Sequence, residues 1–334
     1  MTSYLALRHS SGHAWKRRQV QAKWKNLLAL LIVLILILAS FNGLVKTFSI
    51  GKYLGTSNWN SNSSFVAVLS TTPLAVFILQ EDPKRLVFLT LDEKTYLITG
   101  NPNEPIAKIS FLINKSNGRD LSKLLSLTFR ANIENYVTFK NDQKINKEEA
   151  IERFKNYSSL LAPFMILTGR IGDDVKDTNI ARLDQFKLWW QIKSVRINQL
   201  ELVDLSQYQE EVVYKDDQKV LGVDNFVLHK VISKYLENGR VTKENLKIKV
   251  INASGIAGAG QLAADFAAGV GVNIVKIETA PNLVDQTFIQ TSVKNKYTVR
   301  YLANIFKCDI KNSSESGEEV SLVIGSDFAS RYFK

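Results

Sequence analysis

Residues 250–269 read VINASGIAGAGQLAADFAAG, an apolar run followed by Gly255, Gly258 and Gly260 and then by an alanine-rich stretch. A buried strand, a glycine turn and a helix are also the parts of a dinucleotide-binding site. The spacing here is GxxGxG, whereas a dinucleotide-binding site has GxGxxG. Glu278 ends the next strand, where a ribose-binding acid would lie. No second nucleotide-binding half follows. The glycines are therefore predicted to allow a tight turn and close helix packing, and no nucleotide cofactor is expected.

This stretch belongs to a C-terminal unit over residues 246–334, which is predicted to fold as β-α-β-β-α-β. Short β-branched runs bounded by turn residues predict strands, and amphipathic or alanine-rich runs predict helices. The expected strands are residues 246–252, 272–278, 287–292 and 320–326, and the expected helices are residues 258–269 and 295–306. The fold class is α/β.

The opposite end of the chain indicates a membrane anchor. Residues 1–26 carry six Lys or Arg and no acidic residue, and residues 27–45 carry no charge. At about 1.5 Å per residue this run spans about 28 Å, close to the ~30 Å hydrocarbon core of a bilayer. The basic excess before the run predicts a single-pass protein with a cytoplasmic N-terminus and an extracellular C-terminus. A buried core helix and a cleaved signal peptide are the alternatives.

The charge distribution argues against a nucleic-acid partner. The net charge is +11, but six of the 43 basic residues lie in the tail, which leaves 37 against 32 acidic residues in the remainder. The excess is concentrated in the tail rather than spread over a folded face. Cys308 is the only cysteine, so the chain forms no internal disulfide.

Between the anchor and the C-terminal unit, residues 46–62 predict a polar tether and residues 63–240 a mixed α/β ectodomain. Gly239 is expected to end its last helix, and the polar segment 237–245 is expected to be a domain boundary. The expected strands are residues 65–70, 74–80, 85–91, 135–140 and 210–215, and the expected helices are residues 118–129, 146–161, 180–205 and 224–239.

The C-terminal unit closely resembles the C-terminal domain that follows many LytR-CpsA-Psr proteins of the bacterial cell envelope. That domain begins with a strand and an N-G/A-[ST]-G turn and closes on a strand followed by a G-S-D turn. The matching residues are Asn252-Ala253-Ser254-Gly255 and Gly325-Ser326-Asp327. The resemblance implies a cell-envelope protein.

The catalytic domain of the same family is similar in outline to residues 90–97, TLDEKTYL. Its members transfer lipid-pyrophosphate-linked glycopolymers onto peptidoglycan, binding the pyrophosphate with arginines and a metal with aspartates. The family segment S-I-P-R-D-T-Y-V has Glu93 here at the arginine position and Lys94 at the aspartate position. A glutamate repels phosphate, and a lysine cannot replace an oxygen ligand of a hard divalent ion. The resemblance therefore implies a degenerate LytR-CpsA-Psr-like domain.

A later family signature, R-x-x-R-Q, is similar to RLDQF, in which Arg182 is kept and Gln185 replaces the second arginine. Other candidates for chemistry are few. His229 lies alone on an amphipathic helix, and the other two histidines fall on the tail, so neither a metal site nor a Ser/His/Asp triad is expected. Cys308 lies among apolar residues and is expected to be buried. The pair Trp189-Trp190 is expected to be a core or interface anchor in preference to a sugar-stacking site.

These features favour a non-catalytic envelope protein that binds peptidoglycan, another wall polymer or an envelope protein through its C-terminal domain. No metal or cofactor is expected. The candidate ligand-binding residues surround the N-terminus of a predicted helix, where a carboxylate of a wall peptide would be stabilised: Asn252, Ser254, Gly255, Gly258 and Gly260. The alternative is a divergent phosphotransferase that moves a glycopolymer from polyprenyl pyrophosphate to peptidoglycan, with Arg182 as its catalytic candidate.

Overall fold

The computed structural model describes residue 32 and residues 54–101, 104–170, 173–213, 219–313 and 320–333. The predicted basic tail and, apart from residue 32, the predicted membrane-spanning segment lie outside the described residues. Among the residues that are described, no helix is both long enough and apolar enough to cross a bilayer. The chain divides into two compact units, Met1–Thr56 and Ser57–Lys334, and the account below concerns the second.

A six-stranded mixed sheet forms the first part of this unit, in the order β7-β6-β1-β2-β3-β8. As predicted, the three apolar runs after the tether are consecutive antiparallel strands, with Leu69 opposite Ala75 and Leu74 opposite Leu91. β6 pairs parallel with β1, and β8 pairs parallel with β3. The strands are β1 (Phe65–Leu69), β2 (Leu74–Gln80), β3 (Arg85–Leu91), β6 (Asn135–Phe139), β7 (Val175–Thr178) and β8 (Leu200–Asp204).

Alternate side chains of β1, β2 and β3 enter two separate cores, because successive residues of a strand point to opposite faces. Val66 and Val76 join one core with residues of α4 and α8, and Ala75 and Phe88 join another with residues of α5 and α7. Burial on both faces explains the unbroken apolar runs in the sequence. The helices are α3 (Ile109–Lys115), α4 (Gly118–Phe129), α5 (Lys147–Ser158), α6 (Ala162–Thr168), α7 (Arg182–Ile192) and α8 (Asn225–Leu236).

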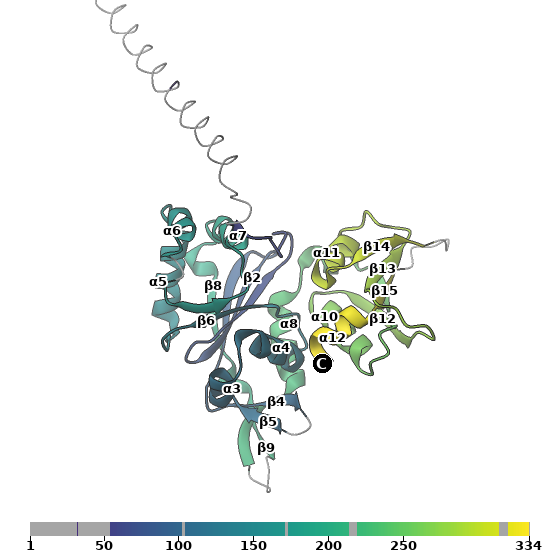
Figure 1. Ribbon diagram of the computed structural model, residues 1–334, viewed down its shortest axis with the longest axis horizontal. Helices are drawn as coiled ribbons and strands as arrows, with labels where there is room; N and C mark the ends of the chain where they lie inside the picture. The colour runs from purple at the N-terminus through teal and green to yellow at the C-terminus, as the bar shows by residue number, and fades with distance from the viewer. Residues whose placement is uncertain are drawn as a thin grey trace, which may run out of the picture. The chain divides into compact units, whose positions relative to one another are not determined.

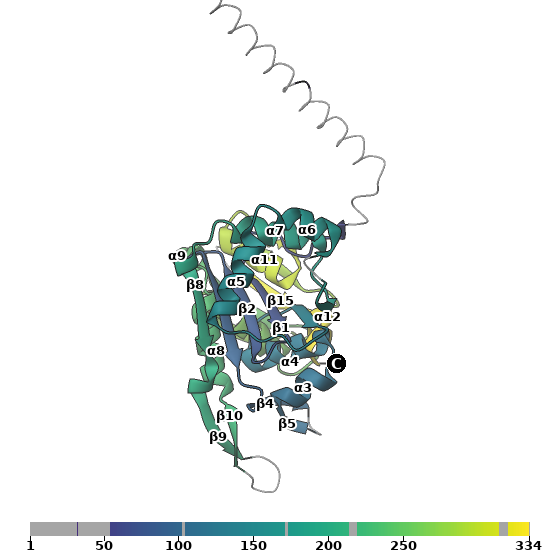
Figure 2. The ribbon, with the colours of Figure 1, turned by 90° about the vertical axis from the view of Figure 1, so that its left-hand side faces the viewer.

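A smaller four-stranded sheet, in the order β5-β4-β10-β9, follows the turn after β3. It lies at the end of the molecule away from α6 and α7 in both ribbon views (Figures 1 and 2). Its strands are β4 (Tyr96–Asn101), β5 (Glu104–Lys108), β9 (Gln209–Val213) and β10 (Lys219–Val223). The predicted strand over residues 210–215 corresponds to β9.

The single long helix predicted over residues 180–205 is wrong. α7 ends at Ile192, a 3-10 turn η2 (Ile197–Gln199) follows, and residues 200–204 form β8. β8 pairs with β3, from Leu86 opposite Leu200 to Thr90 opposite Asp204. An open strand edge therefore overrides a helical pattern in the sequence.

The prediction that Gly239 ends a helix is also wrong. α8 ends at Leu236, and Gly239 is the first residue of α9 (Gly239–Glu244). The Asn238 side chain accepts hydrogen bonds from Arg240 N and Val241 N, which makes it the N-cap of α9. Asn238 and Val241 are buried, whereas five residues of the polar segment 237–245 are exposed.

The C-terminal sheet has five strands in the order β12-β11-β15-β13-β14. Every strand and helix predicted for residues 246–334 is present. β14 and α12 were not predicted. Because α12 begins at Ser326, the G-S-D sequence begins a helix. The elements are β11 (Lys247–Asn252), α10 (Ala259–Gly269), β12 (Asn273–Thr279), β13 (Phe288–Thr291), α11 (Tyr297–Phe306), β14 (Asp309–Asn312), β15 (Val320–Ile324) and α12 (Ser326–Phe333).

One apolar core connects the six-stranded sheet to the C-terminal sheet. Val76 of β2, Ile232 of α8, Phe266 of α10 and Leu322 of β15 all belong to the same buried cluster. α4 and α8 lie between the two sheets (Figure 1). The fold is mixed α/β with several mixed sheets, as the sequence predicted in outline.

Candidate functional site

The turn between β11 and α10 is held by hydrogen bonds among its own residues. The Asn252 amide donates to the Ile256 carbonyl at 2.9 Å and accepts from the Ser254 hydroxyl at 2.7 Å. The Ser254 hydroxyl oxygen accepts from Ile256 N at 3.1 Å. The polar side chains of this predicted site are therefore brought together, and they stabilise the turn.

Its three glycines meet two different requirements. Gly255 and Gly258 have φ values of +75° and +84°, a backbone conformation that favours glycine. Gly260 lies where an added Cβ would be 2.9 Å from Asn252 Cβ, so it allows α10 to approach β11. Each glycine has a structural reason, as the sequence analysis predicted.

The second family turn packs against the loop before β13. The Asp327 carboxylate accepts from Thr287 N at 2.9 Å and from the Thr287 hydroxyl at 2.7 Å, and Gly325 N donates to that hydroxyl at 3.0 Å. An added Cβ at Gly325 would lie 2.6 Å from the Gln286 carbonyl carbon. The G-S-D sequence thus fastens β15 to the loop before β13.

A cleft lies where α11 faces the segment before β1. It has two adjoining compartments of about 80 Å³ and about 310 Å³, which share Asn58, Trp59, Ser63, Asn304 and Lys307. The shared lining presents amide, hydroxyl and ammonium groups beside an aromatic ring. Such a surface can donate and accept hydrogen bonds, as a polar ligand requires.

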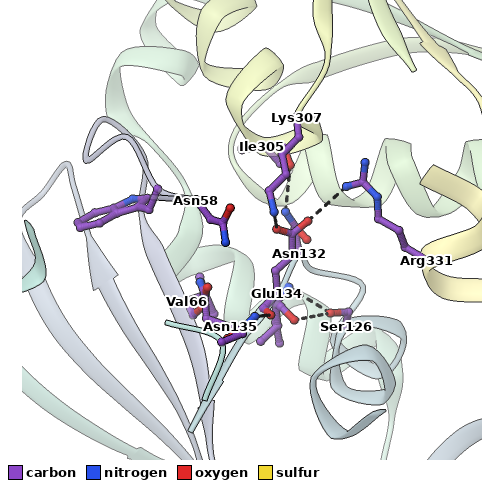
Figure 3. A network of polar contacts seen from close by, with 12 residues as sticks. Asn58, Val66, Ser126, Asn132, Glu134, Asn135, Ile305, Lys307 and Arg331 are labelled. Carbon is purple, nitrogen blue, oxygen red and sulfur yellow. Dashed lines mark hydrogen bonds and ion pairs between the residues drawn. The ribbon is translucent and has the colours of Figure 1, made fainter. Parts of the chain in front are cut away.

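A network of charged and polar groups adjoins this cleft (Figure 3). The Glu134 carboxylate pairs with the Lys307 ammonium and lies 3.4 Å from Arg331 Nη1. The neighbouring Asn132 donates to the Ile305 carbonyl at 3.1 Å and accepts from the Tyr332 hydroxyl at 2.8 Å. The loop between α4 and β6 is therefore fixed to α11 and α12.

α11, which forms one wall of the cleft, is fixed at its N-terminus by Glu244 of α9. The carboxylate accepts from Tyr297 N at 3.2 Å and from Thr298 N at 2.7 Å. Burial alone would raise the pKa of Glu244, but hydrogen bonds from Thr298 and Tyr297 and the charge of Lys296 outweigh burial and lower it. The negative charge also suits the N-terminus of a helix.

Two other titratable side chains border the cleft. Burial raises the pKa of the Tyr301 hydroxyl to about 12. Cys308 is half-buried, and burial raises the pKa of its thiol to about 12, with the charges of Asp327 and Asp309 acting in the same direction. The thiol therefore stays protonated at neutral pH, and Cys308 is less buried than the sequence predicted.

The two segments similar to the catalytic signatures lie at opposite ends of the six-stranded sheet. Glu93 and Lys94 are exposed in the turn after β3. Arg182 begins α7 beside Gly169, and Asp184, two residues later, binds Ser57 and Asn58. α7 and β4 lie at opposite ends in both ribbon views (Figures 1 and 2). The structure does not bring these residues together.

The remaining candidates are placed separately. His229 Nδ1 lies 3.1 Å from the Phe129 carbonyl oxygen, half-buried between α8 and α4. Trp189 is half-buried and Trp190 is 66% exposed, so only the first of the pair is an internal anchor. Within the described ranges, no three His, Cys, Asp or Glu side chains are grouped so that they could hold a metal ion.

No local pattern in the sequence indicates the cleft. Its lining comes from the tether, the loop before β6 and the end of α11, which are far apart in the chain. The nearest signal is the run of Asn and Ser at the end of residues 46–62, which predicts only a polar tether.

The five-stranded sheet and its two fastened turns define a small C-terminal α/β domain. Residues 245–328 match the family model described as LytR cell envelope-related transcriptional attenuator. The chain therefore carries a LytR-type C-terminal domain, as the sequence resemblance predicted.

Solved structures similar to about half of the chain share little sequence with it. TagV of B. subtilis is 12% identical with a TM-score of 0.39, over 52% of this chain and 96% of that chain. Lin1025 of Listeria innocua is 11% identical with a TM-score of 0.39, over 53% and 99%. TagT bound to LIIa-WTA is 12% identical with a TM-score of 0.35, over 53% and 90%. Among curated proteins the sequence has no match.

Proposed function

We propose that this protein is a single-pass, membrane-anchored cell-envelope protein that binds a wall polymer outside the cell through its C-terminal domain. The observation that carries the proposal is the LytR-type domain at residues 245–328, described as cell envelope-related. The uncharged run over residues 27–45 supplies the anchor. The domain boundaries proposed are residues 1–26, 27–45, 46–62, 63–240 and 246–334.

The cleft beside α11 offers the chemistry that a wall polymer needs. Glycan hydroxyl and acetamido groups both donate and accept hydrogen bonds, and so do the amides of Asn58 and Asn304. In Figure 3 the Asn58 amide points toward Lys307 and Glu134. Lys307 adds a cation that can attract a carboxylate of a stem peptide or an acidic polymer.

The turn before α10 is a second candidate contact for the same ligand. Asn252 and Ser254 are engaged in the turn, and so are the N–H groups of Ile256 and Ala259. A ligand would therefore meet the other main-chain N–H groups between Gly255 and Gly260. The first N–H groups of a helix lack intrahelical acceptors and favour anions. Titration with a stem-peptide fragment should shift the amide NMR signals of these residues, and unchanged signals at millimolar peptide would exclude this contact.

A non-catalytic role agrees with the positions of the degenerate signatures. A phosphotransferase of the kind considered above would need Arg182 and the turn at Glu93 and Lys94 to face one substrate, and they lie at opposite ends of a sheet. Magnesium-dependent turnover of a polyprenyl-pyrophosphate glycopolymer that is lost in Arg182→Ala would contradict the non-catalytic proposal.

Sedimentation with purified cell-wall sacculi tests binding. The unit Ser57–Lys334 should sediment with sacculi, and Asn304→Ala should reduce the bound fraction several-fold. Asn273→Ala, at the start of β12 and outside the cleft, is the matched control and should bind like the unmodified protein. Sedimentation no greater than that of an unrelated α/β protein would refute wall binding.

A further inference from the structure

Helix α6 and its neighbour present apolar side chains to solvent. Ala162 and Ile166 of α6 are buried, whereas Leu160, Leu161 and Phe164 are 71%, 67% and 67% exposed. Leu167 is 38% exposed and Trp190 of α7 is 66% exposed. We refer to the five exposed side chains as the α6–α7 surface: Leu160, Leu161, Phe164, Leu167 and Trp190. Single exposed apolar residues are ordinary, but a group of this kind marks a contact surface.

The two helices that carry these side chains are fastened to each other. The Trp189 indole N–H donates to the Ser159 carbonyl at 2.9 Å, which fixes α7 to the turn before α6. The Trp189 ring also contacts the Trp190 ring, with the centroids 5.9 Å apart. α6 and α7 lie side by side in both ribbon views (Figures 1 and 2).

The two segments that carry this surface contain only basic charges, and the exposed acidic residues Glu152, Asp173 and Asp174 lie just outside them. Exposed cations flank both helices, and neither residues 153–170 nor residues 185–200 contain an Asp or Glu. The exposed cations are Lys155, Arg170, Lys193 and Arg196. Aliphatic and aromatic groups surrounded by Lys and Arg are the composition that binds the headgroup region of an anionic membrane.

The start of the described unit is fastened to the same helix. The Asp184 carboxylate of α7 is buried and accepts from Asn58 N at 2.9 Å, from Trp59 N at 3.4 Å and from the Ser57 hydroxyl. Lys187, one turn further along α7, donates to the Trp59 carbonyl. We refer to this set of contacts as the α7 clamp.

Chain length limits how far the clamp can lie from the predicted membrane span. Val45 ends that span, and Ser57 follows twelve residues later. A fully extended chain of that length reaches at most about 43 Å. The chain therefore enters the folded unit no more than about 43 Å from the end of that span, on the helix that carries Trp190.

We infer that the α6–α7 surface rests on the headgroup region of the membrane to which the protein is anchored. This inference depends on the anchor of the proposed function. The apolar side chains enter the interface and the flanking cations contact anionic lipid, so the unit has a fixed face toward the bilayer. The small β5-β4-β10-β9 sheet then lies at the end remote from the lipid.

Site-specific fluorescence in the full chain tests the inference. In a Cys308→Ala background, Phe164→Cys and the control Leu221→Cys are each labelled with an environment-sensitive dye and reconstituted into vesicles with 30% anionic lipid. Leu221 is 52% exposed on β10 of the remote sheet. We expect a blue shift and strong quenching by nitroxide lipid for the dye at residue 164, and neither for the dye at residue 221.

The outcomes separate the surface from the anchor. A chain that does not float with vesicles refutes the anchor. A chain that floats while both dyes report water refutes the surface contact and leaves the anchor intact. A shift at residue 164 that appears in detergent and grows with protein concentration would identify a second copy as the occupant and overturn the inference. Lys193→Glu with Arg196→Glu should weaken the quenching several-fold.

Discussion

Gly325→Ala is expected to be among the most damaging single-methyl additions in the C-terminal domain. The added Cβ would lie 2.6 Å from the Gln286 carbonyl carbon and 2.8 Å from Thr287 N. Both are main-chain atoms, so no side-chain rotation relieves the overlap. Overpacking costs about 1–3 kcal/mol, and displacing the loop weakens hydrogen bonds from Thr287 worth about 1 kcal/mol each. We expect a loss of about 3 kcal/mol in the free energy of unfolding.

Urea unfolding of Ser57–Lys334, followed by circular dichroism, measures this loss. Gly258→Ala is the control: its φ of +84° disfavours alanine, but the nearest atom to the new Cβ is 3.7 Å away on the Phe333 ring. A left-handed backbone alone costs about 1 kcal/mol. If Gly325→Ala destabilised the protein no more than Gly258→Ala does, the close packing inferred for the G-S-D turn would be refuted.

Three further outcomes follow from the site. Glu244→Gln should lower the free energy of unfolding at pH 7. The pKa of Glu244 in the folded protein lies below its usual 4.5, so the difference from the unmodified protein should vanish as the pH falls through that folded pKa. Urea titrations at several pH values measure this difference. Glu134→Gln should lower the free energy of unfolding by about 1–2 kcal/mol, because its two cationic partners lose the carboxylate. High salt should reduce this loss. An unchanged midpoint of urea unfolding would show that the ion pairs contribute no stability. Iodoacetamide at pH 8 should modify Cys308 on the order of a hundredfold more slowly in the folded protein than in the protein unfolded in guanidinium. Mass spectrometry measures both rates, and equal rates would contradict the burial of Cys308.

The local sequence was informative where burial is strong. The strands β1, β2 and β3 are buried on both faces, so their apolar runs stand out. The helix predicted over residues 118–129 has the observed bounds, because Asn117 caps its start and the apolar spacing is regular. The turns at Asn252 and Gly325 were located by their resemblance to the turns of the LytR-type domain, and in the structure both are held by hydrogen bonds of their own side chains.

Elements that depend on a distant partner were missed. β8 exists because the edge of β3 accepts it, and β14 is a four-residue strand that pairs parallel with β13. The cleft has the same origin: Asn58, Glu134 and Lys307 have no sequence pattern in common, and only the packing of α11 against the tether brings them together. Local periodicity contains no information about such pairings.

The continuous apolar core has a mechanical consequence. A pull applied between Ser57 and the C-terminal sheet would enter through the α7 clamp. The load would then cross α8 and α10, whose side chains share one core instead of meeting across a flexible linker. The two parts should therefore unfold together under force, as a single mechanical unit.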